Sequence, residues 1–186
     1  MIIGVSGVAR SGKDTFFKLL KKNLTGKQYG VCKRFAFADE IKKELNEITI
    51  PNFGINCLKT LKKDKEKVRP LMVAYGTHLA RSINKDHWID RIKPHIESHY
   101  RSGGICVITD VRYPNEQEFI KKNFKNSYNI HIHRFGFDPI NSEEEENAPL
   151  LQEKSDYQIS WKTFSDISEG EPFIQGFINE KLRRRK

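Results

Sequence analysis

The sequence predicts an α/β fold with a mainly parallel, doubly wound sheet and helices on both of its faces. Three observations predict it. Short apolar runs that suit buried strands alternate along the 186-residue chain with amphipathic segments that suit helices. A glycine-containing loop joins the first apolar run to the first amphipathic segment. Another apolar run ends in Asp110, at the strand end where such sheets bind their ligands.

Five apolar runs are expected to form the strands: residues 2–6, 31–37, 105–110, 128–134 and 156–160. Helices are expected where apolar residues recur at helical spacing, at 16–24, 38–48, 69–83, 87–100, 115–123 and 173–182. Pro70 would begin the third helix, and Pro94 would interrupt or kink the fourth. Residues 49–68 contain Pro51 and Gly54 and then many lysines, which favours an exposed insertion.

The composition is typical of a globular protein, with 37% hydrophobic and 31% charged residues. No apolar run approaches the roughly 20 residues that span a membrane, and no secretory signal is recognisable. Cys32, Cys57 and Cys106 are too widely spaced for a disulfide framework or a metal site, so a reducing cytoplasm is expected. The net charge of +9 indicates anionic partners, and the basic ending KLRRRK is expected to be a solvated tail.

The loop GVARSGKDT, at residues 7–15, carries most of the phosphate-binding P-loop motif G-x-x-x-x-G-K-[ST]. Gly7 and Gly12 let the backbone approach a phosphate closely, and the loop amides and the helix N-terminus attract its charge. Lys13 is then expected to contact the β- and γ-phosphates of a nucleotide. The strand before the loop and the helix after it supply the context that the motif requires, so an ordinary strand-to-helix turn is the weaker interpretation.

Asp14 occupies the position at which the motif has a hydroxyl that binds magnesium. Mg²⁺ accepts carboxylate oxygen directly or through water, so Asp14 is a candidate magnesium ligand. Thr15 lies about 100° further round the helix and could reach the α-phosphate instead. The alternative for Asp14 is a carboxylate that only stabilises the N-terminus of the helix.

A second motif, ITDVRYPNE, begins in the apolar run at 105–110. Asp110 matches the carboxylate that helps to hold nucleotide magnesium in P-loop enzymes, and a turn residue before Pro114 is the alternative. Arg112 follows at the ligand-binding edge of the sheet. A guanidinium there suits bidentate contact with phosphate.

Four segments, in this order, resemble the phage deoxynucleoside monophosphate kinases: SGKDT at 11–15, FAFADEIK at 35–42, RPLMVAYGTHLAR at 69–81 with Trp88-Ile89 just after, and TDVRYPNE at 109–116. The resemblance covers most of residues 1–134 and becomes thin afterwards. SGKD is shared with other small-molecule kinases, including phosphomevalonate kinases. The combination of G-T-x-x-x-R, W-I and D-V-R-x-P-N-E is more specific, and the aspartate after the lysine is itself a trait of the family.

The resemblance implies one P-loop kinase domain with three parts. The core would comprise residues 1–38, 103–134 and 150–182, the acceptor-binding part about 39–102, and the lid about 135–149. The residues expected to bind ATP are Ala9, Arg10, Ser11, Gly12, Lys13, Asp14 and Thr15. Trp161 is added because of its position after the fifth strand, in a segment that has no recognisable family pattern. Those expected to bind the acceptor are Phe37, Lys42, Arg69, Gly76, Thr77, Arg81, Trp88 and Arg112. Asp14 and Asp110 would hold Mg²⁺.

The reaction that the resemblance implies moves the γ-phosphoryl group of ATP to a deoxynucleoside 5′-monophosphate. The acceptor oxygen is already anionic, so positioning and charge neutralisation would suffice without a general base. The catalytic residues would be Lys13, Arg112 and Arg134. Arg134 ends the strand before the lid and would stabilise the transferring group when the lid closes.

Two alternatives stay open. One is a P-loop kinase of another phosphorylated small molecule, similar to phosphomevalonate kinase. The other, suggested by the positive charge, is a nucleotide-regulated protein that binds nucleic acid, although nucleic acid is the less favoured partner. The expected partners are therefore ATP and a nucleoside monophosphate, with no membrane, and a homodimer is left open.

Overall fold

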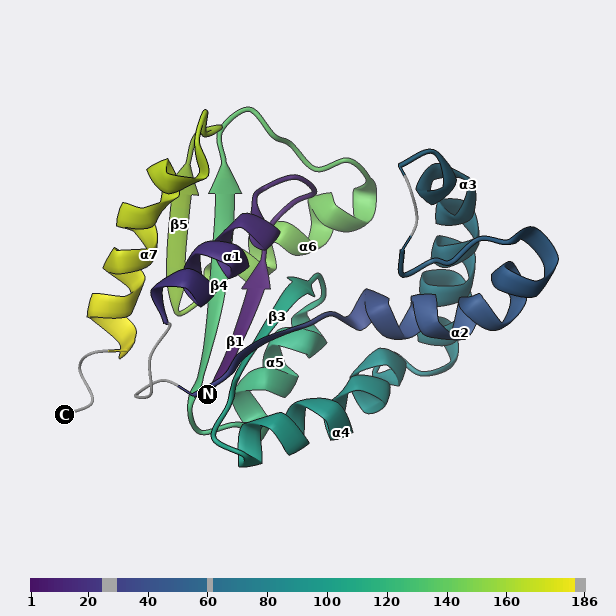
Figure 1. Cartoon of the computed structure of the whole chain (residues 1–186), viewed down its shortest axis with the longest axis horizontal. Coiled ribbons are helices and arrows are strands. Elements are labelled where there is room, and N and C mark those ends of the chain that lie inside the picture. Colours follow the sequence, from purple (N-terminus) through teal and green to yellow (C-terminus); the bar gives the residue numbers. More distant parts are fainter. Residues whose placement is uncertain (25–29, 60–61, 183–186) are drawn as a thin grey trace. The chain divides into compact units, whose positions relative to one another are not determined.

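The computed structural model describes residues 1–24, 30–59 and 62–182, and the chain divides into two compact units (Figure 1). Unit 1 comprises Met1–Arg34 and Ser98–Lys186, and unit 2 comprises Phe35–Glu97. Residues 183–186 of the basic ending lie outside the described residues. Within the described ranges, no helix has both the length and the apolar character needed to cross a membrane.

Unit 1 is built on a five-stranded sheet with the order β2-β3-β1-β4-β5. The strands are β1 (Ile2–Ser6), β2 (Cys32–Phe35), β3 (Ile105–Val111), β4 (Ser127–Arg134) and β5 (Tyr157–Trp161). The central β1 pairs in parallel with β3 and β4, and β4 pairs in parallel with β5. All five strands lie where the apolar runs predict them, and the predicted α/β fold with a parallel sheet is confirmed.

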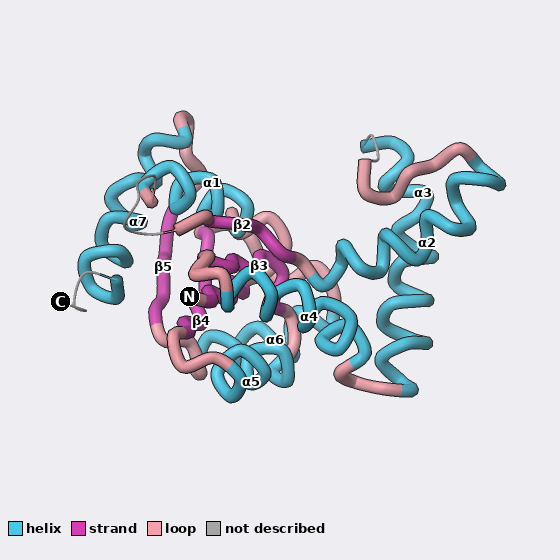
Figure 2. Tube along the Cα trace, turned by 60° about the horizontal axis from the view of Figure 1, so that its bottom comes forward, coloured by secondary structure: helices cyan, strands magenta, loops and turns pink. Residues whose placement is uncertain are grey.

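Helices cover both faces of the sheet, as predicted (Figure 2). On one face lie α1 (Lys13–Asn23) and α7 (Glu171–Phe177), which the short helix η3 (Ile178–Leu182) continues. On the other face lie α5 (Pro114–Asn123) and α6 (Ser142–Glu153). The 3₁₀ turn η2 (Ile167–Gly170) precedes α7.

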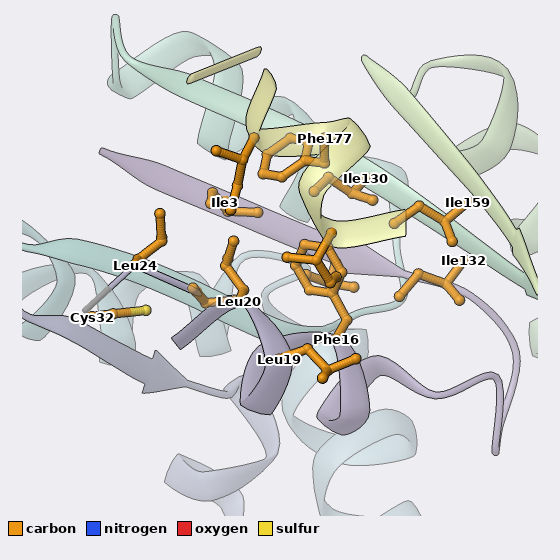
Figure 3. Close-up of a cluster of buried hydrophobic side chains, with 14 of the residues drawn as sticks. Ile3, Phe16, Leu19, Leu20, Leu24, Cys32, Ile130, Ile132, Ile159 and Phe177 are labelled. Atoms are coloured by element: carbon orange, nitrogen blue, oxygen red, sulfur yellow. The ribbon is translucent and has the colours of Figure 1, made fainter. Parts of the chain in front are cut away.

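The core of unit 1 forms where α1 and α7 pack on the sheet (Figure 3). Phe16 and Leu20 of α1 and Phe177 of α7 are each 0% exposed. The rings of Phe16 and Phe177 meet edge to face, with their centroids 5.9 Å apart. Burying one such side chain stabilises a fold by roughly 1.5–3 kcal/mol, so this core fixes the start of α1 and therefore the loop before it.

The helix α6 was not predicted, because residues 135–149 were expected to form a lid and EEEE at 143–146 gives no apolar periodicity. It begins where the Oδ1 of Asn141 accepts a hydrogen bond from the amide of Glu144 at 2.9 Å. The acidic residues of its first turn also suit the positive end of the helix. The sequence therefore did carry a signal, an asparagine cap followed by an acidic turn.

Unit 2 is helical, with α2 (Phe37–Phe53), α3 (Lys62–Val73), the π-helix η1 (Ala74–Arg81) and most of α4 (His87–Arg101). Leu45, Cys57 and Val68 form its small core, packed against the partly buried Ile41, Ile55, Met72 and Tyr75. Cys32 and Cys106, by contrast, are buried thiols of β2 and β3 in unit 1, as predicted.

The exposed insertion predicted at 49–68 is wrong in part. The helix α2 continues through Pro51 to Phe53 and ends at Gly54, whose φ of 66° suits a helix terminus. A further helix, α3, begins before Pro70, which lies inside it and does not start it. Similarly, α4 runs through Pro94 without interruption. Packing of the apolar face outweighs the lost backbone hydrogen bond at these prolines.

Candidate nucleotide-binding site

The loop between β1 and α1 has the backbone conformation that suits phosphate binding. Gly7 and Gly12 have φ angles of 136° and 99°, and Arg10 has the unusual value of 64°. A side chain at Gly12 is unfavourable for two reasons. The φ angle lies in the left-handed region, and a Cβ there would lie only 2.7 Å from the ring of Trp161. Alternation between left- and right-handed conformations makes successive amides converge into a concave, anion-binding surface.

Lys13 is the first residue of α1, and its ammonium group turns back onto the loop. The Nζ atom donates to the carbonyl oxygens of Gly7 at 2.7 Å and Val8 at 2.8 Å. Burial, followed by the positive charge of Arg112, lowers the pKa of Lys13 from 10.5 to about 8. Three carboxylates act on the same pKa in the opposite direction: Glu144, Asp110 and Asp14. Lys13 is therefore surrounded by charged groups, of which all but Asp14 are far from it in the sequence.

The other loop carbonyls are held by β4 and β5. Arg134, the last residue of β4, donates from Nη1 to the carbonyl of Arg10 at 3.0 Å. Trp161, the last residue of β5, donates from Nε1 to the carbonyl of Ser11 at 2.7 Å. These two bonds fix the carbonyls of Arg10 and Ser11, so β4 and β5 help to set the backbone conformation of the loop.

Trp161 is only 2% exposed, because its ring lies beneath Gly12. This environment indicates that it supports the loop from below, while the predicted contact of Trp161 with ATP stays a prediction. A shallow pocket nearby is lined by Gly12, Thr15, Arg134, Trp161, Lys162, Phe164 and Ile167. Lys162 and Phe164 were not predicted, since the segment after β5 has no recognisable motif.

Arg112 and Asp110 lie at the carboxyl end of β3. The backbone amide of Arg112 donates to Oε2 of Glu116 at 2.7 Å, and the amide of Tyr113 donates to the same oxygen at 3.2 Å. Glu116 is itself 0% exposed, so the P-N-E part of the motif fixes the backbone from which the Arg112 side chain extends. That side chain is 47% exposed and its Nη1 lies 3.6 Å from Oε1 of Glu144.

Asp14 lies in the first turn of α1, with a side chain that is 77% exposed. Its Oδ1 lies 3.6 Å from Nε of Arg34, near the end of β2. Arg34 was not predicted, because the pattern of β2 gives no reason to single it out. The two side chains bring a carboxylate and a guanidinium to the same end of the sheet as Asp110.

Magnesium was predicted at Asp14 and Asp110, which lie close enough to Lys13 for both charges to affect its pKa. Among the described residues, no three His, Cys, Asp or Glu side chains gather closely enough to hold a metal ion by themselves. Kinases bind Mg²⁺ through one or two carboxylates together with substrate phosphates, so these two aspartates suit such a site.

The predicted acceptor residues other than Arg112 all lie in unit 2. Phe37 and Trp88 are 2% and 0% exposed, so neither ring presents a face to solvent. Trp88 donates from Nε1 to the carbonyl of Gly76 at 2.9 Å, which ties α4 to the π-helix. Thr77 lies in that same π-helix, a conformation often found at functional sites.

The predicted acceptor cations have local partners. The Nζ of Lys42 lies 2.8 Å from Oδ1 of Asp39, and the Nη1 of Arg81 donates to the carbonyl of Lys85 at 3.4 Å. Arg69 is exposed on α3. Their role in acceptor binding stays a prediction.

Comparisons with known proteins identify the family of the chain and support its fold. The family model for phosphomevalonate kinase matches residues 5–126, more than half of the 186-residue chain. A search of curated protein sequences gives no match.

Among solved structures, the chain is similar to an unliganded sugar kinase from Janibacter sp. HTCC2649, with 11% identity and a TM-score of 0.51 over 96% of this chain and 94% of that chain. It is also similar to an APS kinase from Mycobacterium tuberculosis, with 10% identity and a TM-score of 0.43 over 96% of each chain. The first likeness supports a P-loop kinase fold. The family model, which matches more than half of the chain, leads to one conclusion: the chain belongs to the phosphomevalonate kinase family.

Proposed function

We propose that the protein transfers the γ-phosphoryl group of ATP to a deoxynucleoside 5′-monophosphate. One observation carries the proposal, the meeting of Lys13, Arg112 and Asp110 at the loop and the end of β3. This group combines two cations for phosphate oxygens with a carboxylate for magnesium, which is what phosphoryl transfer requires.

In the proposed complex, Lys13 exchanges its two loop carbonyls for the β- and γ-phosphate oxygens. Its ammonium is already aligned by the hydrogen bonds to Gly7 and Val8, so it needs a small movement only. Arg112 extends from a backbone fixed by Glu116 and would neutralise charge on the transferring phosphoryl group. Mg²⁺ that binds with ATP at Asp14 and Asp110 would supply further neutralisation.

The acceptor assignment rests on the motifs of unit 2. A nucleotide 5′-phosphate needs its own cations, because it must lie near the ATP phosphates that repel it. Arg81 of the G-T-x-x-x-R motif is the proposed cation, with Gly76 and Thr77 near the base or the phosphate. The π-helix brings these three residues onto consecutive turns.

A second candidate is a phosphorylated small molecule without a base, as in phosphomevalonate kinase, and the family match favours it. Both acceptors are phosphate monoesters, and both reactions give a diphosphate. The same cations therefore serve either reaction, and the nucleobase is the feature that separates them.

The test is an acceptor panel. The protein is incubated with radiolabelled ATP, Mg²⁺ and, separately, each common ribo- and deoxyribonucleoside monophosphate and phosphomevalonate, and the products are separated by chromatography. Labelled deoxynucleoside diphosphates are expected, with the Lys13→Ala variant as the inactive control. Turnover of phosphomevalonate only would establish the second candidate, and hydrolysis of ATP with no labelled acceptor would overturn both.

A further inference from the structure

Glu144 is a buried carboxylate that the proposed reaction does not use. It lies in the first turn of α6 and is only 9% exposed. Its Oε2 accepts a hydrogen bond from the amide of Ala9, within the P-loop, at 3.0 Å. Its Oε1 lies 3.6 Å from Nη1 of Arg112. One carboxylate thus contacts both a loop amide and the arginine at the end of β3.

These two partners are groups that bind phosphate in the proposed complex. A loop amide offers a hydrogen bond to an anion, and a guanidinium offers a charge-assisted one. Glu144 supplies an anion to both from within the chain. Its negative charge also reaches Lys13, whose pKa it pushes upward. The carboxylate therefore has the same three neighbours that a phosphate group would have.

The position of Glu144 is set by contacts of α6 that do not involve the loop. Asn141 caps the helix, and the carboxylate of Glu143 accepts a hydrogen bond from the hydroxyl of Tyr113. Further along, the Nε2 atom of Gln117 donates to the carbonyl of Leu151 at 3.0 Å. Beside this contact, a narrow pocket between α6 and the loop is lined by residues that include Gly7, Val8, Arg112 and Glu144.

Glu144 contributes one more bond, to the segment that enters the helix. The amide of Ile140 donates to the same Oε2 at 3.4 Å. Because Ile140 and Ala9 share this oxygen, the carboxylate links residues 135–149 to the P-loop.

We propose that Glu144 is an internal latch, a carboxylate that occupies the phosphate-binding groups of the nucleotide-free protein and leaves them when nucleotide phosphates bind. Phosphate and carboxylate carry like charges, so both cannot share the Ala9 amide and Arg112. Departure of Glu144 frees the first turn of α6 and the chain before it. Nucleotide binding is thereby coupled to movement of residues 135–149. The inference rests on the ATP-binding part of the proposed function and does not depend on the acceptor.

The matched pair Glu144→Gln and Glu145→Gln tests the latch. Glutamine keeps the shape and a hydrogen-bond acceptor for Ala9 but removes the charge that competes with phosphate. Glu145 lies in the same helical turn and is exposed, so its substitution controls for charge loss on the protein surface. With Mg²⁺ and ATP in a calorimeter, Glu144→Gln should lower the Kd for ATP about tenfold, while Glu145→Gln changes it less than about twofold.

An unchanged or higher Kd for Glu144→Gln would overturn the latch, since the carboxylate would then not compete with ATP. Hydrogen–deuterium exchange on the wild-type chain supplies a readout that does not need a variant. ATP should slow exchange in the P-loop and accelerate it at residues 140–144. Slower or equal exchange at residues 140–144 would contradict release of the segment.

The two proposals fail in different ways. If Glu144→Gln binds ATP more tightly but the acceptor panel yields no labelled nucleotide, the latch stands and the proposed acceptor is wrong. If labelled diphosphates form and Glu144→Gln binds ATP as the wild type does, the reaction stands and the latch is wrong.

Discussion

The cations of unit 1 and the predicted acceptor cations of unit 2 are held in different ways. Lys13 and Arg134 both donate to carbonyls of the P-loop. Arg134 is 124 residues from its partner Arg10 in the sequence, so only the fold can bring it to the loop. Lys42 contacts Asp39 of the same helix, and Arg81 contacts the carbonyl of Lys85 in the turn after the π-helix. The first pair therefore holds the P-loop itself, whereas the described bonds of the second pair hold no loop of the candidate site.

This difference separates two kinds of binding site. Groups that the fold already orients lose little freedom when a ligand binds, and they can act strongly in the transition state. The described bonds of Lys42 and Arg81 do not hold a binding loop in place, so we expect these cations to contribute to affinity more than to rate. We therefore expect substitutions at the loop to lower kcat and substitutions in unit 2 to raise the KM of the acceptor.

The largest effect is expected from Lys13→Ala. Removal of a positioned charge that contacts the transferring phosphoryl group should lower kcat by at least about a hundredfold. The variant should still fold, because the core beneath α1 is formed by Phe16, Leu20 and Phe177 and does not include Lys13. Steady-state kinetics with thermal melting of the same sample measure both. Near-normal turnover by a folded variant would remove Lys13 from the mechanism.

Arg81→Ala should have the next largest effect, confined to one substrate. Loss of a charge-assisted hydrogen bond costs about 1.5–3 kcal/mol, so the KM for the nucleoside monophosphate should rise roughly tenfold to a hundredfold. The KM for ATP should change by less than about twofold. Arg112→Ala is the counterpart in unit 1, and it should lower kcat as well.

Two saturation curves per variant, one for each substrate, give these values. Arg81→Lys keeps the charge without the planar fork and should fall between the wild type and Arg81→Ala. If Arg81→Ala raises the KM for ATP and leaves the KM for the acceptor unchanged, the acceptor site has been assigned to the wrong residues.

Asp14→Asn should produce a smaller change, in the magnesium requirement. Its side chain is 77% exposed, and its 3.6 Å contact with Arg34 is an exposed pair that adds little stability. A magnesium role predicts that the Mg²⁺ concentration for half-maximal rate rises several-fold, with the melting temperature almost unchanged. A role limited to the helix N-terminus predicts a loss of about 1 kcal/mol in the free energy of unfolding and an unaltered magnesium titration.

The two units also differ in what their sequences made predictable. The P-loop was recognisable because Gly7, Gly12 and Lys13 are close in sequence and each has a local reason for its place. In unit 2, the rule that proline ends or begins a helix misplaced the boundaries near Pro51 and Pro70. That rule describes an isolated helix, whereas packing around Leu45 and Val68 decides the outcome here.

Glu144 could not be placed from sequence, since it contacts a loop amide 135 residues away. Four consecutive glutamates at 143–146 look equivalent along the chain. The Asn141 cap sets the phase of α6, and that phase points Glu144 inward and leaves Glu145 exposed. The residue at which α6 begins therefore decides which glutamate is buried. The run of four glutamates does not by itself reveal where that helix begins.

The smallest expected effect is the uptake of a fraction of a proton when ATP binds. It tests whether the buried ammonium of Lys13 contacts the phosphates. Burial and the charge of Arg112 lower the pKa of Lys13 to about 8, so its ammonium is about three-quarters deprotonated at pH 8.5 in the free protein. Phosphate oxygens favour the charged ammonium and should raise that pKa. ATP binding at pH 8.5 should then be accompanied by proton uptake. Calorimetry in Tris and in tricine, which differ in ionisation enthalpy, measures this uptake.

Lys13→Ala should abolish the proton uptake, whereas Arg81→Ala should leave it unchanged, because an arginine does not titrate at this pH. Equal heats in both buffers for the wild type would mean that the phosphates of ATP do not approach Lys13. The proposed role of Lys13 as the cation of the P-loop that contacts phosphate would then be wrong.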